Sequence, residues 1–390
     1  MSFEVYLPTR WIFGAGALNE LGGYPMPGRK AMLVISNGKS TRANGYLERT
    51  QQQLKQAGAD SAVFDRVEAN PLKSTVMAGA AFAKENGCDF IVALGGGSVM
   101  DAAKAMAAMA TNPGDLWDYM NGGTGKGKAL VEAPLPLVAI TTTAGTGSEV
   151  DQYGVISNEE TREKMGFGGA DSLFPVLAVV DPELMTTVPP RFTAYQGFDA
   201  LFHSTETYIH KGANHFSDMV ALNAIENVAR YLPRAVRDGS DLEARERVAL
   251  GNTLSGYSMV TGSCTSEHSL EHAMSAFHHD LPHGAGLIMV SVAYYTHFIR
   301  RHACDDRFVR MARAMGMENA ADPMDFITAL TRLQQDCGVA ELKMSDYGFT
   351  PDEFEPLARN ARDTMGGLFL SDRLPLSIGD CVEIYKASFR

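Results

Sequence analysis

The order of apolar segments along the chain constrains its fold more than any other feature of the sequence. In the first half, short apolar runs of strand length alternate with longer stretches of helical periodicity. The strand candidates are residues 31–35, 61–64, 89–94 and 137–140, and the helix candidates are residues 45–57, 74–86 and 99–110. Because this alternation is typical of α/β proteins, the first half is predicted to form a parallel, Rossmann-like sheet with helices on both faces.

From about residue 192 the pattern becomes almost entirely helical. The predicted helices cover residues 192–210, 215–232, 242–260, 266–277, 284–300, 305–315, 323–337, 351–363 and 377–387. Pro189 and Pro190 directly precede this change, and consecutive prolines interrupt regular structure. The sequence therefore predicts an α/β domain over residues 1–189, followed by an all-α domain over residues 190–390.

Composition excludes several classes of protein. The chain has 390 residues, enough for two domains that each bury a core. Its net charge of −12 repels phosphate backbones, so we expect no nucleic-acid partner. No apolar run approaches the ~18 residues of a membrane span, and the N-terminus lacks the features of a signal peptide. The five cysteines are scattered without a CxxC pair, which favours the reducing cytoplasm.

Two of the predicted strands end in loops rich in small residues. Strand 89–94 runs into residues 95–98 (GGGS), and strand 137–140 runs into residues 141–149 (TTTAGTGSE). A backbone without Cβ atoms can approach a phosphate closely, and the free N–H groups of a helix N-terminus bind the anion. Since the carboxyl ends of parallel strands share one edge of a sheet, the two loops together favour a bound nucleotide over two simple turns.

The second half carries all of the histidines. The ten histidines lie between His203 and His302, and Asp199 precedes His203 by four residues, so that both project from one face of a predicted helix. Five follow within a short stretch: His268, His272, His278, His279 and His283. A single histidine is more often a core or surface residue, but this density favours a metal site. One carboxylate with up to three imidazoles suits iron(II) or zinc.

Taken together, these motifs resemble those of the iron-dependent (group III) alcohol dehydrogenases over essentially the whole chain, and most closely the butanol dehydrogenase-like branch. The shared motifs are residues 8–10 (PTR), 13–16 (FGAG), 95–101 (GGGSVMD), 112–115 (NPGD), 142–149 (TTAGTGSE) and 197–200 (GFDA), His203, His268, His272 and residues 282–284 (PHG). The resemblance implies a nucleotide-binding α/β domain, a helical metal-binding domain and a homodimer. It also implies Fe(2+), or alternatively Zn(2+), and NAD(P) as cofactors.

The resemblance assigns roles to particular residues. The implied metal ligands are Asp199, His203, His268 and His283. The implied cofactor-binding residues are Asn70, Gly96, Gly97, Ser98, Asp101, Thr142, Thr143, Thr146 and Lys164. His272 is implied to lie near the reacting groups. The segment between His268 and His283 is one residue longer than in the lactaldehyde reductase branch of the family, so His283 is a firmer candidate than its neighbours.

The expected reaction is the reversible oxidation of a primary alcohol to an aldehyde. The metal would act as a Lewis acid on the alcohol oxygen, and the nicotinamide would accept the hydride. His272 would relay the proton, or else pack beside the metal-binding helix. Two alternatives remain: a zinc-dependent polyol dehydrogenase or dehydroquinate synthase on the same fold, and a non-catalytic nucleotide-binding protein.

The residues after the first predicted strand bear on cofactor choice. In many dinucleotide enzymes an acidic residue after an early strand binds the ribose 2′-hydroxyl and repels a 2′-phosphate. Here the corresponding residues are Ser36, Asn37, Gly38, Lys39 and Ser40, none of them acidic. A lysine and two hydrogen-bond donors suit a phosphate, so NADP(H) is predicted to be used at least as well as NAD(H). The alternative is that Lys39 points into solvent and both cofactors are accepted.

Overall fold

The computed structural model describes residues 2–390, which form two compact units. One unit comprises residues 6–143 and 147–186, and contains all the strands. The other comprises residues 187–390 together with residues 144–146 and 2–5, and is built from helices. The helical unit thus begins at Thr187 rather than at residue 190. It also includes residues 144–146, which a division of the sequence at one position could not predict.

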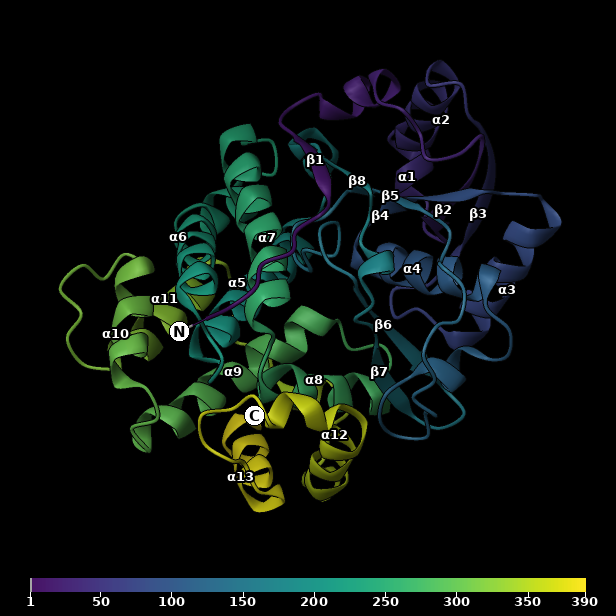
Figure 1. Cartoon of the computed structure of the whole chain (residues 1–390). Coiled ribbons are helices and arrows are strands. Elements are labelled where there is room, and N and C mark those ends of the chain that lie inside the picture. Colours follow the sequence, from purple (N-terminus) through teal and green to yellow (C-terminus); the bar gives the residue numbers. More distant parts are fainter. Residues whose placement is uncertain (1) are drawn as a thin grey trace. The chain divides into compact units, whose positions relative to one another are not determined.

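The sheet of the first unit is parallel, as predicted, and it contains six strands (Figure 1). They are β1 (Arg10–Phe13), β2 (Lys30–Ser36), β3 (Asp60–Val67), β4 (Phe90–Gly95), β5 (Leu137–Thr141) and β8 (Leu177–Val180), in the order β1-β8-β5-β4-β2-β3. The antiparallel hairpin of β6 (Tyr153–Asn158) and β7 (Glu163–Gly168) was not predicted, nor were β1 and β8, which have only four residues each.

Helices cover both faces of this sheet because its central strands are apolar on both sides. Along β2 and β4, Leu33 and Val92 belong to one core cluster, which also includes residues of η1 (Ala17–Gly23) and α2 (Tyr46–Gln56). The alternate residues face the opposite side, where α3 (Lys73–Glu85) and α4 (Gly97–Thr111) pack. Each fully buried Val or Leu contributes about 1.5–3 kcal/mol of transfer free energy, so continuous apolar strands stabilise a sheet covered on both faces.

Strand order reverses between β2 and β4. From β2 the chain moves outward to β3, and it then returns to the other side of β2 to form β4 and, beyond it, β5. Ligands of open α/β sheets bind outside the carboxyl ends of the strands at such a reversal. The loops that follow β2, β3, β4 and β5 are therefore the relevant part of this unit.

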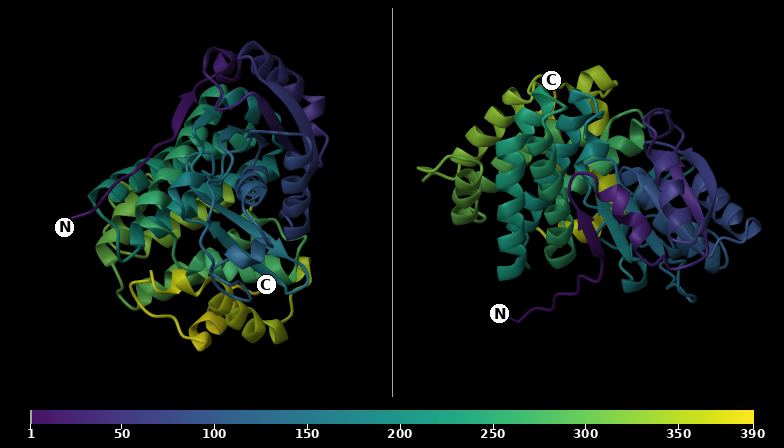
Figure 2. Two further views of the ribbon diagram at one scale, coloured as in Figure 1. Left: turned by 45° about the vertical axis from the view of Figure 1, so that its right-hand side comes forward. Right: turned by 90° about the horizontal axis from the view of Figure 1, so that it is seen from above.

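Nine helices of the second unit match the nine predicted ones. They are α5 (Pro190–Ile209), α6 (His215–Arg237), α7 (Leu242–Gly262), α8 (Ser266–Phe277), α9 (His283–Arg300), α10 (Asp305–Ala314), α11 (Asp325–Asp336), α12 (Phe354–Phe369) and α13 (Ile378–Ser388). Helices α5, α6 and α7 pack side by side (Figure 2). Helix α12 runs beyond the predicted end at residue 363, through a kink at Met365, where φ is −130° and ψ is 38°.

Long segments of two helices in this unit are buried and still carry many polar residues. From Phe198 to Ile209 every residue of α5 is buried, and α8 is buried from Ser266 to Ser275. Buried polar side chains need partners, so their concentration on two adjoining segments marks a site.

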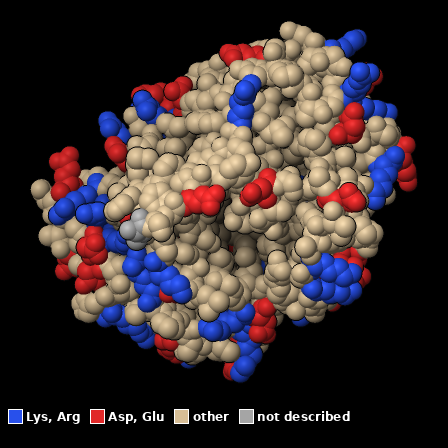
Figure 3. Space-filling model, in the orientation of Figure 1, with Lys and Arg blue, Asp and Glu red and all other residues tan. Residues whose placement is uncertain are grey.

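On the face drawn in Figure 3, acidic and basic side chains are interspersed without a continuous basic patch. Among residues 2–390, no helix is long and apolar enough to cross a membrane.

Candidate active site

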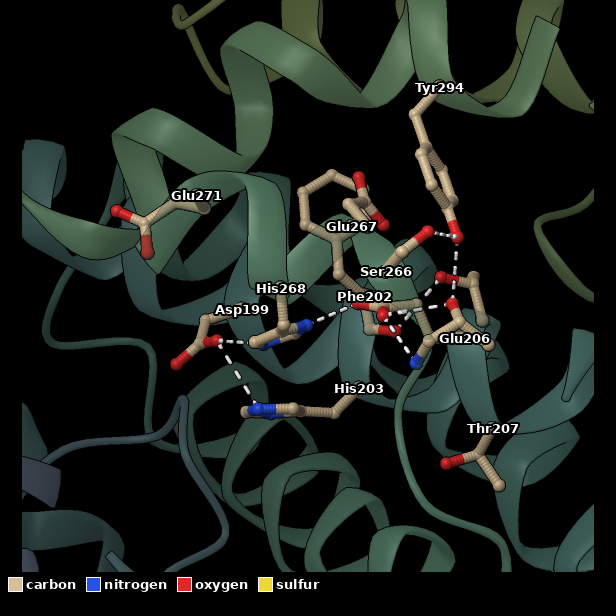
Figure 4. A network of polar contacts seen from close by, with 12 residues as sticks. Asp199, Phe202, His203, Glu206, Thr207, Ser266, Glu267, His268, Glu271 and Tyr294 are labelled. Atoms are coloured by element: carbon tan, nitrogen blue, oxygen red, sulfur yellow. Dashed lines mark hydrogen bonds and ion pairs between the residues drawn. The ribbon is translucent and has the colours of Figure 1, made fainter. Parts of the chain in front are cut away.

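The four candidate metal ligands come together inside the helical unit. Asp199 and His203 lie one turn apart on α5, His268 lies on α8, and His283 is the first residue of α9. Pro282 precedes His283 with extended backbone geometry, so the chain turns there and α9 starts with its first side chain at the cluster. Figure 4 shows Asp199, His203 and His268 facing one another.

Three imidazoles point their Nε2 atoms at one carboxylate oxygen. The distances from Asp199 Oδ1 to Nε2 are 3.6 Å for His203, 3.5 Å for His268 and 3.4 Å for His283. The rings of His203 and His268 are stacked with centroids 4.4 Å apart. Asp199, His268 and His283 also form one of the clusters whose ligand atoms are close enough together to hold a metal ion.

Two atoms at the centre of this cluster lack hydrogen-bond partners. Asp199 Oδ1 and His268 Nε2 are both buried and unsatisfied. An unsatisfied buried donor or acceptor costs about 1–3 kcal/mol, and more when it is charged. A divalent cation among the four side chains would satisfy both atoms, so these residues fit the metal that the resemblance implies.

The electrostatics of the cluster favour a cation. Burial alone would raise the pKa of Asp199, but His203 and His283 hold it well below its usual range, so the group is a carboxylate. Burial lowers the pKa of His203 to about 3, which leaves a neutral imidazole able to donate a lone pair. Burial opposes a charge on His268, yet Glu206 and Asp199 raise its pKa well above the ordinary value. A proton therefore occupies His268 when no metal is bound, and metal binding would release it.

Sequence reasoning missed the residues behind the imidazoles. The Nδ1 atom of His268 contacts Glu206, and that of His283 contacts Glu271. The only available signal for Glu206 was its position seven residues after Asp199, two turns along the same helix face. The buried thiol of Cys264 also lies beside His203 and His268, and nothing in the sequence pattern distinguished it from the other cysteines.

His272 adjoins the cluster, and one of its ring nitrogens lies within 4.8 Å of ligand atoms of Glu271 and His283. Its ring centroid lies 5.2 Å from that of His283 and 6.1 Å from that of His268. Its Nδ1 atom lies against the sulfur of Met365, at the kink in α12. His272 thus lies beside two of the four candidate ligands.

His278 lies apart from the four candidate ligands. Its Nε2 atom is 2.9 Å from a carboxylate oxygen of Glu353, and its ring packs on Phe349 with centroids 3.9 Å apart. His283, and not His278, therefore lies at the cluster with Asp199.

In the α/β unit, the loops after four parallel strands are tied together at one edge of the sheet. The N–H of Thr142 donates to the carbonyl of Gly95 at 2.9 Å, and the N–H of Asn37 donates to that of Val67 at 2.9 Å. The Ser98 hydroxyl donates to the carbonyl of Ala69. These contacts join the loops after β2, β3, β4 and β5, and thereby gather most of the predicted cofactor-binding residues.

Gly96 is required for this arrangement. A Cβ atom there would lie 2.9 Å from both Cγ2 and Oγ1 of Thr143, so a larger residue would push the two loops apart. Helix α4 starts directly after it at Gly97, and the first N–H groups of a helix have no partner within the helix. The N–H groups of Val99 and Met100 donate to the carbonyl of Gly96, and the N–H groups at a helix start can bind an anion.

Other predicted cofactor residues lie in different surroundings. Asn37, Gly38, Lys39 and Ser40 are exposed. Lys164 is buried on β7, and Thr146 belongs to the short segment that groups with the helical unit. Asp101 is buried, accepting hydrogen bonds from Ser148 Oγ at 2.8 Å and from the N–H of Val155 at 2.9 Å. Burial raises the pKa of Asp101 to about 6.

The fold and the site together define a two-unit oxidoreductase architecture, with a nucleotide-type parallel sheet and a helical unit that carries an Asp-His₃ cluster. Comparison with known proteins agrees. Residues 8–182 match the model of the iron-containing alcohol dehydrogenases, and residues 193–389 match the C-terminal model of the same family. The chain belongs to the iron-containing alcohol dehydrogenase family.

Individual relatives are similar over nearly their full lengths. The chain is 34% identical over 371 residues to 1,3-propanediol dehydrogenase of Klebsiella pneumoniae, covering 92% of each chain. The crystal structure of an archaeal halo-thermophilic alcohol dehydrogenase from a Red Sea brine pool has a TM-score of 0.93 at 32% identity, with 100% of this chain and 99% of that chain covered. NADH-dependent butanol dehydrogenase A of Thermotoga maritima has a TM-score of 0.87 at 27% identity, with the same coverage.

These findings confirm the predicted family, fold class and enzyme class. The chain is an alcohol dehydrogenase of the iron-containing type, which interconverts an alcohol and an aldehyde with NAD(P).

Proposed function

We propose that Asp199, His203, His268 and His283 bind one divalent metal, with iron(II) the native ion and zinc the alternative. The observation that carries this proposal is the convergence of three Nε2 atoms on Asp199 Oδ1 at 3.4–3.6 Å, with Asp199 Oδ1 and His268 Nε2 otherwise unsatisfied. In this proposal residues 190–390 form the metal-binding and catalytic domain, and residues 1–189 form the dinucleotide-binding domain.

Each side chain then has a distinct task in alcohol oxidation. The bound metal would supply Lewis-acid chemistry at the alcohol oxygen, and the nicotinamide would accept the hydride. The Asp199 carboxylate offsets part of the metal charge in a buried site, and the neutral imidazole of His203 donates a lone pair without adding charge. His272, which lies beside His283, would accept the proton that the alcohol loses and pass it outward.

The dinucleotide would bind along the edge of the sheet where the loops are joined. The N–H groups at the start of α4 suit the pyrophosphate, because a helix N-terminus carries a partial positive charge. The residues assigned to this site are Asn70, Gly96, Gly97, Ser98, Asp101, Thr142, Thr143, Thr146 and Lys164. The buried Asp101 would support the site indirectly, because it accepts hydrogen bonds from Ser148 and Val155 and so holds the adjoining loop and hairpin in place.

NADP(H) is proposed to serve at least as well as NAD(H). The exposed residues after β2 (Asn37, Gly38, Lys39 and Ser40) include a positive charge and no acidic side chain that would repel a 2′-phosphate. The Thermotoga maritima relative is named as NADH-dependent, so the proposed use of NADP(H) would distinguish this enzyme from that relative.

The substrate class is a short primary alcohol and its aldehyde. The names of two relatives, for 1,3-propanediol and butanol, support this proposal. The enzyme is proposed to work in the cytoplasm as a homodimer, without a nucleic-acid or membrane partner. A zinc-dependent polyol dehydrogenase is the second candidate, since an Asp-His₃ set also suits zinc.

The test is anaerobic preparation of metal-free protein, followed by reconstitution with iron(II) or zinc. Loaded protein is assayed with a panel of short aldehydes and with glycerol, and cofactor oxidation or reduction is read by absorbance. Activity on the aldehydes with iron(II) would support the proposal. Turnover of glycerol alone with zinc would favour the polyol alternative, and failure to bind either metal would reject the ligand set.

A further inference from the structure

The orientation of each imidazole depends on what its second ring nitrogen contacts. A histidine that binds a metal through Nε2 usually donates its Nδ1–H to an acceptor, which fixes both the tautomer and the ring direction. Resting on the ligand set proposed above, we infer that Glu206 and Glu271 are positioning residues for the metal, acting through His268 and His283 respectively. Neither glutamate belongs to the ligand set.

Glu206 is fully buried and is itself held on both oxygens. Its Oε1 atom contacts Nδ1 of His268, and its Oε2 atom accepts hydrogen bonds from the N–H of Thr265 at 2.7 Å and from the Thr265 hydroxyl at 3.0 Å. Thr265 in turn accepts a hydrogen bond from the Tyr294 hydroxyl at 2.9 Å, and that hydroxyl lies 3.2 Å from Asp372 Oδ1 (Figure 4 shows the part around Glu206 and Tyr294). The carboxylate therefore has one fixed direction.

Glu271 performs the same role for the ligand on the next helix. It is fully buried on α8, its Oε2 atom contacts Nδ1 of His283 at the start of α9, and its Oε1 atom accepts from the Ser275 hydroxyl. Gly286 makes room for it, because a Cβ atom there would lie 2.7 Å from Glu271 Cγ and 2.8 Å from Oε1. The contact joins α8 to α9 across residues 278–282, the loop in which the sequence is one residue longer than in one branch of the family.

The third imidazole, that of His203, has no carboxylate at its Nδ1 atom among the contacts described. Nδ1 of His203 lies 3.3 Å from the carbonyl of Gly145, a neutral acceptor at the long end of the hydrogen-bonding range. Two of the three imidazoles thus have a carboxylate behind them. A charged acceptor makes a stronger hydrogen bond than a carbonyl and raises the basicity of the ring as a ligand.

Substitutions at the two glutamates should weaken metal binding to different degrees. In Glu206→Gln the amide must turn its NH₂ group toward either the Thr265 donors or His268, so one donor–donor clash is unavoidable. In Glu271→Gln the NH₂ group can face Ser275, whose hydroxyl can rotate to accept, so only the charge is lost. Loss of such an outer contact typically costs about 10- to 100-fold in metal affinity. We expect a loss of that size for Glu206→Gln and Glu271→Ala, and a smaller loss for Glu271→Gln.

The experiment measures zinc affinity and zinc release with a chromophoric chelator, on full-length protein without substrate or cofactor. Glu267→Gln is the matched control, since Glu267 is buried on the same helix and accepts a hydrogen bond from Tyr295. Circular dichroism and the melting temperature of the metal-free proteins report whether each variant folds. If Glu271→Ala does not fold, Glu206→Gln and Glu271→Gln decide the question.

The expected result is wild-type zinc affinity in Glu267→Gln, with weaker affinity and faster release in the folded Glu206 and Glu271 variants. Wild-type affinity and release in folded Glu206→Gln and Glu271→Ala would overturn the inference. An equal loss in Glu267→Gln would also overturn it, because the effect would then be a general consequence of altering a buried carboxyl. Failure of the wild-type protein itself to bind zinc or iron would instead reject the proposed ligand set.

Discussion

Replacing His268 with alanine should remove most of the metal from the protein. Structural zinc sites with four protein ligands contribute apparent binding free energies of about 10–16 kcal/mol, which is roughly 2.5–4 kcal/mol for each ligand. With 1.4 kcal/mol for each factor of ten, loss of one ligand should weaken metal binding by roughly 60- to 700-fold. Activity should fall at least in proportion.

The structure adds a second consequence of the same substitution. Without His268, the buried Glu206 loses one of its partners and keeps only the backbone N–H and the hydroxyl of Thr265. A buried carboxylate with an incomplete set of partners destabilises the fold. We therefore expect a lower melting temperature in metal-free His268→Ala than in metal-free wild type.

The assay is metal content after dialysis, measured by mass spectrometry, together with chelator competition. His278→Ala is the control, since His278 pairs with Glu353 and lies outside the cluster. It should retain wild-type metal content. His272→Ala should likewise retain the metal while turnover slows. A His268→Ala protein with undiminished metal content would show that the ligand assignment is wrong.

Three further predictions concern the cofactor and the pH dependence of stability. Gly97→Val should raise the dissociation constant of the cofactor while leaving the fold intact, because a branched side chain would stand at the start of α4; unchanged affinity in a titration with folded protein would move the phosphate site elsewhere. Lys39→Ala should lower kcat/KM for NADPH but not for NADH, measured with one short aldehyde. A strong wild-type preference for NADH that the substitution does not alter would contradict the proposed use of NADP(H). Burial raises the pKa of Asp372 from 3.8 to about 7, so the folded state holds this proton more tightly than the unfolded state. Its stabilising contribution is complete below about pH 4 and is lost as the pH rises through about 7, a change of at most about 4 kcal/mol in the free energy of unfolding. Denaturant titrations from pH 4 to 8 should show a smaller decline in Asp372→Asn, and an identical decline would contradict the assignment.

The sequence alone was sufficient for the regular elements that bury a continuous apolar face. All nine predicted helices of the second half are present, and their limits lie within three residues of the predicted ones, except that α6 ends five residues and α12 six residues later than predicted. Strands β2, β3, β4 and β5 were also found, because apolar runs of strand length between turn residues leave few alternatives. Strands β1 and β8 were missed because four residues carry too little periodicity.

The metal-binding region was also visible in the sequence for a local reason, whereas the choice of His268 and His283 among its histidines came from the family resemblance. Asp199 and His203 are one helical turn apart, and His268, His272 and His283 lie within one short stretch. Helical spacing places the first pair on one face without any knowledge of the tertiary structure. Hydroxyl-rich and glycine-rich loops at strand ends were recognisable in the same way.

Only the tertiary structure decided which residues stand behind the ligands. Glu206 meets His268 across 62 residues of sequence, and no periodicity relates the two. The sequence likewise does not show whether Glu271 and His278 face solvent, because their partners His283 and Glu353 depend on how α8 packs with α9 and α12. Contacts of this kind depend on how helices are placed in space, whereas the spacing of residues within one helix is fixed by its 3.6-residue turn.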